Sequence, residues 1–151
     1  MRKLFLTVFY SGLSPKAPGT AGSFVSLIIG LALLNYLHVS TLFLLALLIT
    51  VFAIKQIDIY EKEVGEHDSK EIVIDELAGM WIALSICGIT QENYIVMGAL
   101  AFIYFRIFDI WKPWIIKTYD NKSGAFYVMI DDVLAGFFAA IFISLSFLLI
   151  S

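Results

Sequence analysis

The sequence predicts an all-α fold: a polytopic membrane helical bundle of about five hydrophobic helices with a polar site at one end. Of the 151 residues, 60% are hydrophobic and 15% are charged, and the mean hydropathy is +0.89. A soluble domain of this length needs a more polar surface. The apolar residues also form long blocks between short charged stretches, as in helices that cross a bilayer. Because no linker-like or repetitive stretch interrupts the sequence, we expect residues 1–151 to form a single membrane-embedded domain.

The first apolar block is long enough for two helices. It covers residues 24–54, and polar residues near its middle favour a tight helical hairpin over one long helix. Small residues at four-residue spacing, such as Gly79 and Ala83, would let helices pack closely in lipid. The first and third helices are short for a full crossing of about 20 residues, so we expect one of them to be short or re-entrant. The expected helices are residues 22–37, 40–60, 72–89, 93–110 and 131–150.

The charged residues agree with five crossings. In that topology alternate loops lie on opposite sides of the membrane, and all 10 Lys and Arg residues fall on one side. The positive-inside rule assigns that side to the cytoplasm. Of the 13 acidic residues, only Glu92 falls on the far side. We therefore expect any chemistry to take place at the cytoplasmic face.

The segment just before the first helix, residues 14–23, contains two prolines and two glycines. Prolines fix the backbone, and the free N–H groups at the start of a helix attract anions. Lys16 would add a positive charge, Gly19 would permit close approach, and Thr20 or Ser23 would add a hydroxyl group. This pattern predicts an anion-binding turn. The alternative is a rigid turn in which Thr20 or Ser23 is only the N-cap of the helix.

Two adjacent acids, Asp75 and Glu76, lie in an otherwise apolar helical stretch. An ionised side chain in such a place costs several kcal/mol unless it is paired or bound to a cation. A compensating positive charge is therefore expected nearby. The alternative is that both are ordinary first-turn acids, which the helix dipole favours.

A third polar motif ends the fourth expected helix. Arg106 and Asp109 are three residues apart and so share a helix face, where a simple ion pair is the alternative to a functional role. Lys112 follows them, and Pro113 closes the segment. The neighbouring tryptophans suit the membrane interface, which places this charged cluster at headgroup depth.

The fifth expected helix begins with a second pair of adjacent acids. Asp131 is a good N-cap candidate, which leaves Asp132 without a routine explanation. Two neighbouring acids beside an apolar helix suit a hard cation with oxygen ligands, such as Mg²⁺.

All four motifs fall at the cytoplasmic ends of their helices, and acids and bases gathered in this way suit phosphoryl chemistry at a membrane surface. The expected metal ligands are Asp75, Glu76, Asp109, Asp131 and Asp132. The expected phosphate-binding residues are Lys16, Gly19, Thr20, Ser23, Arg106 and Lys112. The expected catalytic residues are Lys16, Asp75, Glu76, Arg106, Asp109 and Asp132.

Two other functions remain open at this point. A small transporter or channel would need polar groups along its depth, and a non-catalytic scaffold would need only an acidic cytoplasmic face. The net charge of -3 argues against nucleic acid as a partner. No obligatory protein partner is implied.

The four motifs resemble those of the bacterial phosphatidylglycerophosphatase A family. They are residues 14–23, 74–81, 105–114 and 130–136, in the order in which the family has them. The resemblance implies a Mg²⁺-dependent enzyme of the bacterial inner membrane that removes the terminal phosphate from phosphatidylglycerophosphate and leaves phosphatidylglycerol.

Within that resemblance, Asp75, Glu76 and Asp132 would be central to Mg²⁺ binding, and Asp109 and Asp131 would contribute directly or by orienting other ligands. Lys16, Arg106 and Lys112 would neutralise the phosphate. Either a metal-activated water or an aspartate would attack the phosphorus.

Overall fold

The structure, a computed structural model, describes residues 1–150, and within that range it is all-helical. The all-α fold predicted from the sequence is therefore confirmed. The helices in chain order are α1 (Arg2–Leu6), the 3₁₀ helix η1 (Ser11–Leu13), α2 (Pro18–Leu34), α3 (Val39–Val64), α4 (Ile74–Ile86), α5 (Tyr94–Trp111), α6 (Ile115–Asp120) and α7 (Ala125–Ile150).

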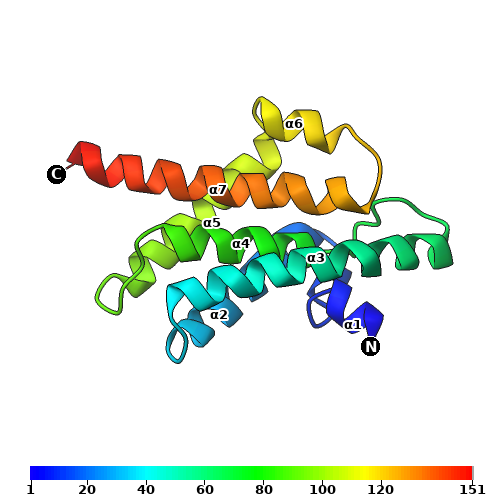
Figure 1. Cartoon of the computed structure of the whole chain (residues 1–151), viewed down its shortest axis with the longest axis horizontal. Helices are drawn as coiled ribbons and strands as arrows, with labels where there is room; N and C mark the ends of the chain where they lie inside the picture. Colours follow the sequence, from blue (N-terminus) through cyan, green and yellow to red (C-terminus); the bar gives the residue numbers. More distant parts are fainter. Residues whose placement is uncertain (151) are drawn as a thin grey trace.

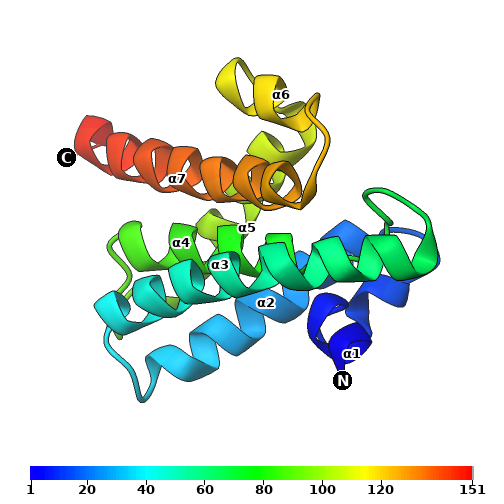
Figure 2. The ribbon, with the colours of Figure 1, turned by 45° about the vertical axis from the view of Figure 1, so that its right-hand side comes forward.

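Helix α4 is the centre of the bundle. It packs against α2, α3, α5 and α7, and Figures 1 and 2 show α7 along one side of it and α2 on the other. Apart from Asp75, every residue from Ile74 to Leu84 is buried, as expected for a helix that is apolar on all sides. With 13 residues, α4 is about 20 Å long, less than the hydrocarbon thickness of about 30 Å. The expectation of a short third helix is confirmed.

The longer helices surround this core. Within the described residues, α3, α5 and α7 are long and apolar enough to cross a membrane, and α2 is a shorter apolar helix. Large apolar side chains face outward along them, including Leu48 and Val51 on α3 and Leu148 on α7. Such a surface is stable only in lipid. The protein is therefore a membrane helical bundle.

Two glycines bring α4 and α7 into backbone contact. A Cβ atom on Gly79 would lie 2.4 Å from the carbonyl oxygen of Asp132, and one on Gly136 would lie 2.2 Å from the carbonyl oxygen of Gly79. Neither position has room for a side chain, and small residues at such crossings let membrane helices approach closely. The crossing holds the acid pair of α4 beside the acid pair of α7.

Two expected helix starts are wrong. Helix α7 begins at Ala125 and not at residue 131, so Asp131 lies inside the helix and is not an N-cap. The apolar periodicity continues backwards through the buried Ala125 and Val128 to a turn at Gly124, whose φ is 119°. Helix α2 begins at Pro18, where the missing N–H costs nothing. Thr20 and Ser23 therefore lie within α2 and are not N-caps.

Candidate active site

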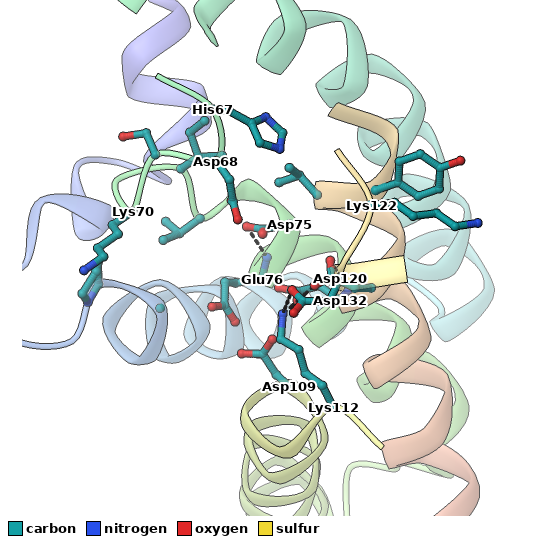
Figure 3. Close-up of a pocket in the computed structure, with 18 residues that line it drawn as sticks. His67, Asp68, Lys70, Asp75, Glu76, Asp109, Lys112, Asp120, Lys122 and Asp132 are labelled. Carbon is teal, nitrogen blue, oxygen red and sulfur yellow. Dashed lines mark hydrogen bonds and ion pairs between the residues drawn. The ribbon is translucent and has the colours of Figure 1, made fainter. Parts of the chain in front are cut away.

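The polar ends of the helices enclose a cavity of about 280 Å³. Its walls come from the start of α2, the loop before α4, the first turn of α4, the end of α5, α6, and the first turns of α7. Figure 3 shows carboxylates from these separate segments directed into one space. The acids that line the cavity are Asp68, Asp75, Glu76, Asp109, Asp120, Asp131 and Asp132, and the basic residues are His67, Lys70, Lys112 and Lys122.

Three buried carboxylates form the centre of the site. Glu76 from α4, Asp109 from α5 and Asp132 from α7 each offer an oxygen, and these oxygens lie within 4.8 Å of one another. Like charges buried this close repel strongly unless positive charge is present. Clustered carboxylate oxygens are also the ligands that hard divalent cations prefer.

Arg106 supplies part of the positive charge. Its Nη1 atom lies 2.9 Å from Glu76 Oε2 and 2.5 Å from Asp109 Oδ2, so the ion pair expected within α5 forms and also reaches α4. Ser23 from α2 donates a hydrogen bond of 2.6 Å to Glu76 Oε2. A Cβ atom on Gly19 would lie 2.6 Å from Glu76 Oε1, so a larger residue there would displace the Glu76 carboxylate.

Asp132 is the acid that the protein leaves least satisfied. Its side chain is buried, and among the described residues its Oδ2 atom has no hydrogen-bond partner. An unpaired buried oxygen costs about 1–3 kcal/mol or more for a charged group. The Nε atom of Arg106 also lacks a partner in the described part of the chain. An unsatisfied buried acceptor and an unsatisfied buried donor among the site residues fit a site for both a cation and an anionic ligand.

The second basic residue, Lys112, ends α5 in a left-handed conformation, with φ 49°. Its Nζ atom lies 2.6 Å from Asp131 Oδ2 and 2.6 Å from Asp120 Oδ1. Burial lowers the pKa of Lys112, but its hydrogen bonds to Asp120 and Asp131 outweigh burial and raise the pKa above the ordinary lysine value. Lys112 is therefore a cation at neutral pH.

The structure brings together most of the site residues expected from sequence. Two of them lie apart: Lys16 and Thr20 are exposed, and neither lines the cavity. Gly19, Ser23, Asp75, Glu76, Arg106, Asp109, Lys112, Asp131 and Asp132 line the cavity or contact residues that do.

The sequence reasoning missed several residues at the rim of the cavity. Asp120 lies on the short helix α6, and only its ion pair with Lys112 distinguishes it from a solvated loop acid. Asp68 belongs to a charged run before α4, where the composition gave no reason to select it. Lys122 packs over the rings of Tyr119 and Tyr127, and Figure 3 shows it extending away from the carboxylates.

The buried polar residues also bear on the channel alternative. Among the described residues, the buried acids gather at the pocket end, and the rest of the core is apolar except for small hydroxyl residues such as Ser26. A path for ions needs polar groups along its whole depth. The fold and the pocket thus define a class: a helical membrane protein whose acids and bases gather at one end of the bundle.

The family profile described as Phosphatidylglycerophosphatase A matches residues 4–147, and the chain belongs to that family. It is therefore a phosphatase. The chain is 38% identical over 135 residues to the phosphatidylglycerophosphatase A of Escherichia coli K12. The aligned residues cover 87% of this chain and 75% of that relative. It is 37% identical over 134 residues to the phosphatidylglycerophosphatase A of Haemophilus influenzae. The aligned residues cover 88% of this chain and 80% of that relative.

A third relative carries a different description. A putative phosphatidylinositol-3-phosphatase of Bacteroides thetaiotaomicron is 40% identical over 144 residues, which cover 93% of this chain and 89% of the relative. No solved structure is significantly similar to the chain. The helices and the bacterial relatives together identify a bacterial membrane protein.

Proposed function

We propose that the protein hydrolyses the terminal phosphate monoester of phosphatidylglycerophosphate, giving phosphatidylglycerol and phosphate, with Mg²⁺ as cofactor. The observation that carries this proposal is the buried cluster of Glu76, Asp109 and Asp132, next to the cations Arg106 and Lys112. Two of the relatives are described as phosphatases of this lipid.

The donor set fits a divalent cation. Glu76, Asp109 and Asp132 would hold the ion, and Asp75 and Asp131 line the same cavity. These five acids exceed the charge of Arg106 and Lys112, so the site has negative charge left for a cation to balance. When bound, the ion supplies Lewis-acid stabilisation of the negative charge on the phosphoryl group.

Arg106 and Lys112 prepare the pocket for a phosphate. The hydrogen bonds to Glu76 and Asp109 fix the guanidinium group in place before substrate arrives, and its unpaired Nε–H would gain an acceptor in a phosphate oxygen. Lys112, held by Asp120 and Asp131, lines the cavity and adds a second positive charge to the site. Charge that is fixed in advance stabilises a phosphoryl transition state without reorganisation.

The position of the pocket in the bundle supports a reaction at the membrane surface. The pocket opens at the end of the bundle that carries the basic residues, which under the positive-inside rule supports an active site that faces the cytoplasm from the bacterial inner membrane. The phosphate of a lipid headgroup lies at this depth, and the acyl chains would stay in the bilayer.

The proposal is tested with purified full-length protein in detergent, by measuring phosphate release from phosphatidylglycerophosphate. We expect release with Mg²⁺ and none after chelation. Asp75→Asn should lower turnover, by less than Asp132→Asn, and leave the bundle folded, whereas Asp58→Asn, an exposed acid of α3 paired with Lys62, should behave like the wild type. Release that survives chelation would refute the metal assignment. Faster hydrolysis of phosphatidylinositol 3-phosphate would refute the substrate assignment.

The orientation has a separate test. A Glu92→Cys variant carries a thiol in the loop between α4 and α5, at the end of the bundle away from the pocket, while the native Cys87 is buried. An impermeant maleimide should label it from outside intact cells. Labelling only after the cytoplasmic side is opened would reverse the proposed orientation.

A further inference from the structure

The residue just before α4, Val73, is held by two other parts of the chain. It is 1% exposed and lines the active-site cavity. Its N–H donates to the carbonyl oxygen of Leu6, at the end of α1, at 2.9 Å. A Cβ atom on Gly22 of α2 would lie 2.6 Å from the Cβ atom of Val73. Val73 is therefore where α1, α2 and α4 meet, and Figures 1 and 2 show α1 and α2 both on the side of α4 away from α7.

The turn that follows α1 is rigid. Residues 8–10 all have positive φ values, of 46°, 54° and 65°, and strain of this kind persists only where the surrounding contacts fix it. One such contact is the buried side chain of Thr7. Its Oγ1 atom donates to the carbonyl oxygen of Lys3 at 2.7 Å and accepts the N–H of Tyr10 at 3.0 Å. The segment that holds Val73 from the N-terminal side is thus fixed by its own hydrogen bonds.

Gly12, in η1, extends this contact to the chain before α4. A Cβ atom on Gly12 would collide with the carbonyl oxygen of Glu71 and would lie 3.1 Å from Cγ2 of Val73. No side chain fits between η1 and the chain before α4. Val73 thus packs against two glycines, Gly12 and Gly22, and has little room to move.

The face of α2 that meets Val73 also holds Glu76. Gly19, Gly22 and Ser23 are three and four residues apart and so share that face. Gly22 contacts Val73, while Ser23 donates to Glu76 Oε2 at 2.6 Å. A Cβ atom on Gly19 would lie 2.6 Å from Glu76 Oε1. Val73 and Glu76 are three residues apart at the start of α4, so the spacing of α2 and α4 at Val73 also sets the position of the Glu76 carboxylate.

We propose that Val73 is a positioning residue for the active site: its close contact with Gly22 fixes the spacing of α2 and α4 and so holds Glu76 in the carboxylate cluster. The inference rests on the proposed function, because it concerns the cation site of that reaction. Val73 is apolar and binds neither the cation nor the phosphate. It acts through the backbone, since its Cβ atom is attached directly to the main chain and cannot rotate away from a methyl group added at Gly22.

The test uses purified full-length protein in detergent. It measures the affinity for Mn²⁺, which replaces Mg²⁺ at oxygen sites, and kcat/KM for phosphate release. Gly22→Ala should lower both by at least about tenfold, because the cluster loses its spacing. Val73→Gly adds no clash, and glycine is tolerated at the position before a helix. It should lower Mn²⁺ affinity by about fivefold, because the spacing is no longer fixed.

The double variant tests the contact itself. Val73→Gly removes the Cβ atom that the new methyl group of Gly22→Ala would meet. Gly22→Ala with Val73→Gly should therefore restore Mn²⁺ affinity and kcat/KM to within about twofold of the wild type, as expected for two positions in direct contact. Circular dichroism confirms that each variant is folded. Val73→Gly and the double variant decide the question if Gly22→Ala is too unstable to purify.

Gly30→Ala is the matched control, because Gly30 lies between the same two helices but away from the cavity. Its new methyl group would lie 2.7 Å from Cδ1 of Leu84 and 3.0 Å from the ring of Trp81, and none of these three residues lines the active-site cavity. Gly30→Ala should lower the melting temperature, as Gly22→Ala does, and leave Mn²⁺ affinity and kcat/KM unchanged. A purely structural role for the contact at Val73 would make the two variants alike.

Three results would overturn the positioning role. One is normal Mn²⁺ affinity in Gly22→Ala and in Val73→Gly. Another is a folded double variant that binds Mn²⁺ no better than the weaker of the two single variants. The third is a loss of Mn²⁺ affinity in Gly30→Ala as large as that in Gly22→Ala. Failure of the proposed function would look different, because the wild-type protein itself would then bind no Mn²⁺ or release no phosphate.

Discussion

The two acid pairs of the pocket, Asp75–Glu76 on α4 and Asp131–Asp132 on α7, are built alike and neutralised differently. In each pair, Oδ1 of the first acid accepts the backbone N–H of the second at 3.0 Å. In each pair the second acid belongs to the central carboxylate cluster. The same local geometry thus presents one carboxylate from each helix to a common point.

The difference lies in which member of the pair meets a positive charge. On α4 it is the central acid, since Glu76 bonds to Arg106 and Ser23. On α7 it is the outer acid, since Asp131 bonds to Lys112, and within the described chain Oδ2 of Asp132 has no hydrogen bond. The protein therefore satisfies the α4 side by itself and leaves an oxygen of α7 for a ligand. A substitution at Asp132 therefore tests the difference between the two acid pairs most directly.

The largest expected effect follows from removing the charge of Asp132. Asp132→Asn keeps the size of the side chain, and we expect kcat for phosphate release to fall about a thousandfold, because the acid with the free oxygen can no longer bind the cation. Stability without metal should be unchanged or higher, since a buried unpaired charge is gone. Activity assays and thermal unfolding in detergent measure the two effects.

Asp58→Asn is the matched control, because it removes an exposed acid of α3 whose partner is Lys62. It should change neither quantity. Near-normal turnover in Asp132→Asn, or a loss of activity that comes with unfolding, would show that the unpaired oxygen has no special role.

A smaller effect is expected at the crossing that brings the pairs together. Gly136→Ala puts a methyl group 2.2 Å from the backbone of Gly79, so α4 and α7 must separate. We expect about 1–3 kcal/mol of destabilisation and a fall in kcat/KM of about a hundredfold, because displacing catalytic groups by about 1 Å is costly. Gly98→Ala on α5 is the control, since the atoms nearest to its new methyl group are the flexible ends of Leu31, at 3.1 Å, and Leu27, at 3.6 Å. Equal effects in both variants would show that the close crossing of α4 and α7 does not position the acid pairs.

The sequence predicted the acid pairs better than it predicted their setting. Asp75 and Glu76 stood out because ionised groups in an apolar run need a partner; Arg106 was selected as a site residue, but as the partner of Asp109, and its ion pair with Glu76 was not predicted. The starts of α2 and α7 were misplaced because hydropathy does not reveal Pro18 as a first helical residue or the extra turns after Gly124. Asp120 was missed because its role depends on α6 folding back onto α7, a tertiary contact without a local signal.

Lys16 illustrates a different limit of the sequence. A lysine between two prolines before a helix suits an anion site, but the local pattern does not say which way the turn faces. In the structure the side chain is exposed and does not line the cavity. Ser23, from the same segment, does reach Glu76, because α2 starts early enough to bring it onto the face that meets α4.

The smallest expected effect concerns the outer acid of α7. Lys112→Gln removes the cation that bonds to Asp131 and Asp120 but leaves Arg106 in place. We expect KM for the lipid to rise about tenfold with a modest change in kcat, because one of two phosphate-binding charges is lost. Lys117→Gln, on the exposed side of α6, should leave both constants unchanged. A fall in kcat as large as that of Asp132→Asn would show that the two halves of the α7 pair do not differ.

The central claim is that carboxylates from α4, α5 and α7 form one divalent-cation site, and it is tested most directly by metal binding without turnover. Mn²⁺ replaces Mg²⁺ at oxygen sites and is visible by electron paramagnetic resonance. The account predicts that purified wild-type protein binds Mn²⁺, that Mg²⁺ displaces it, and that Asp132→Asn and Glu76→Gln bind it at least about tenfold more weakly, while Asp58→Asn binds it normally. Undiminished Mn²⁺ binding in both cluster variants would contradict the account.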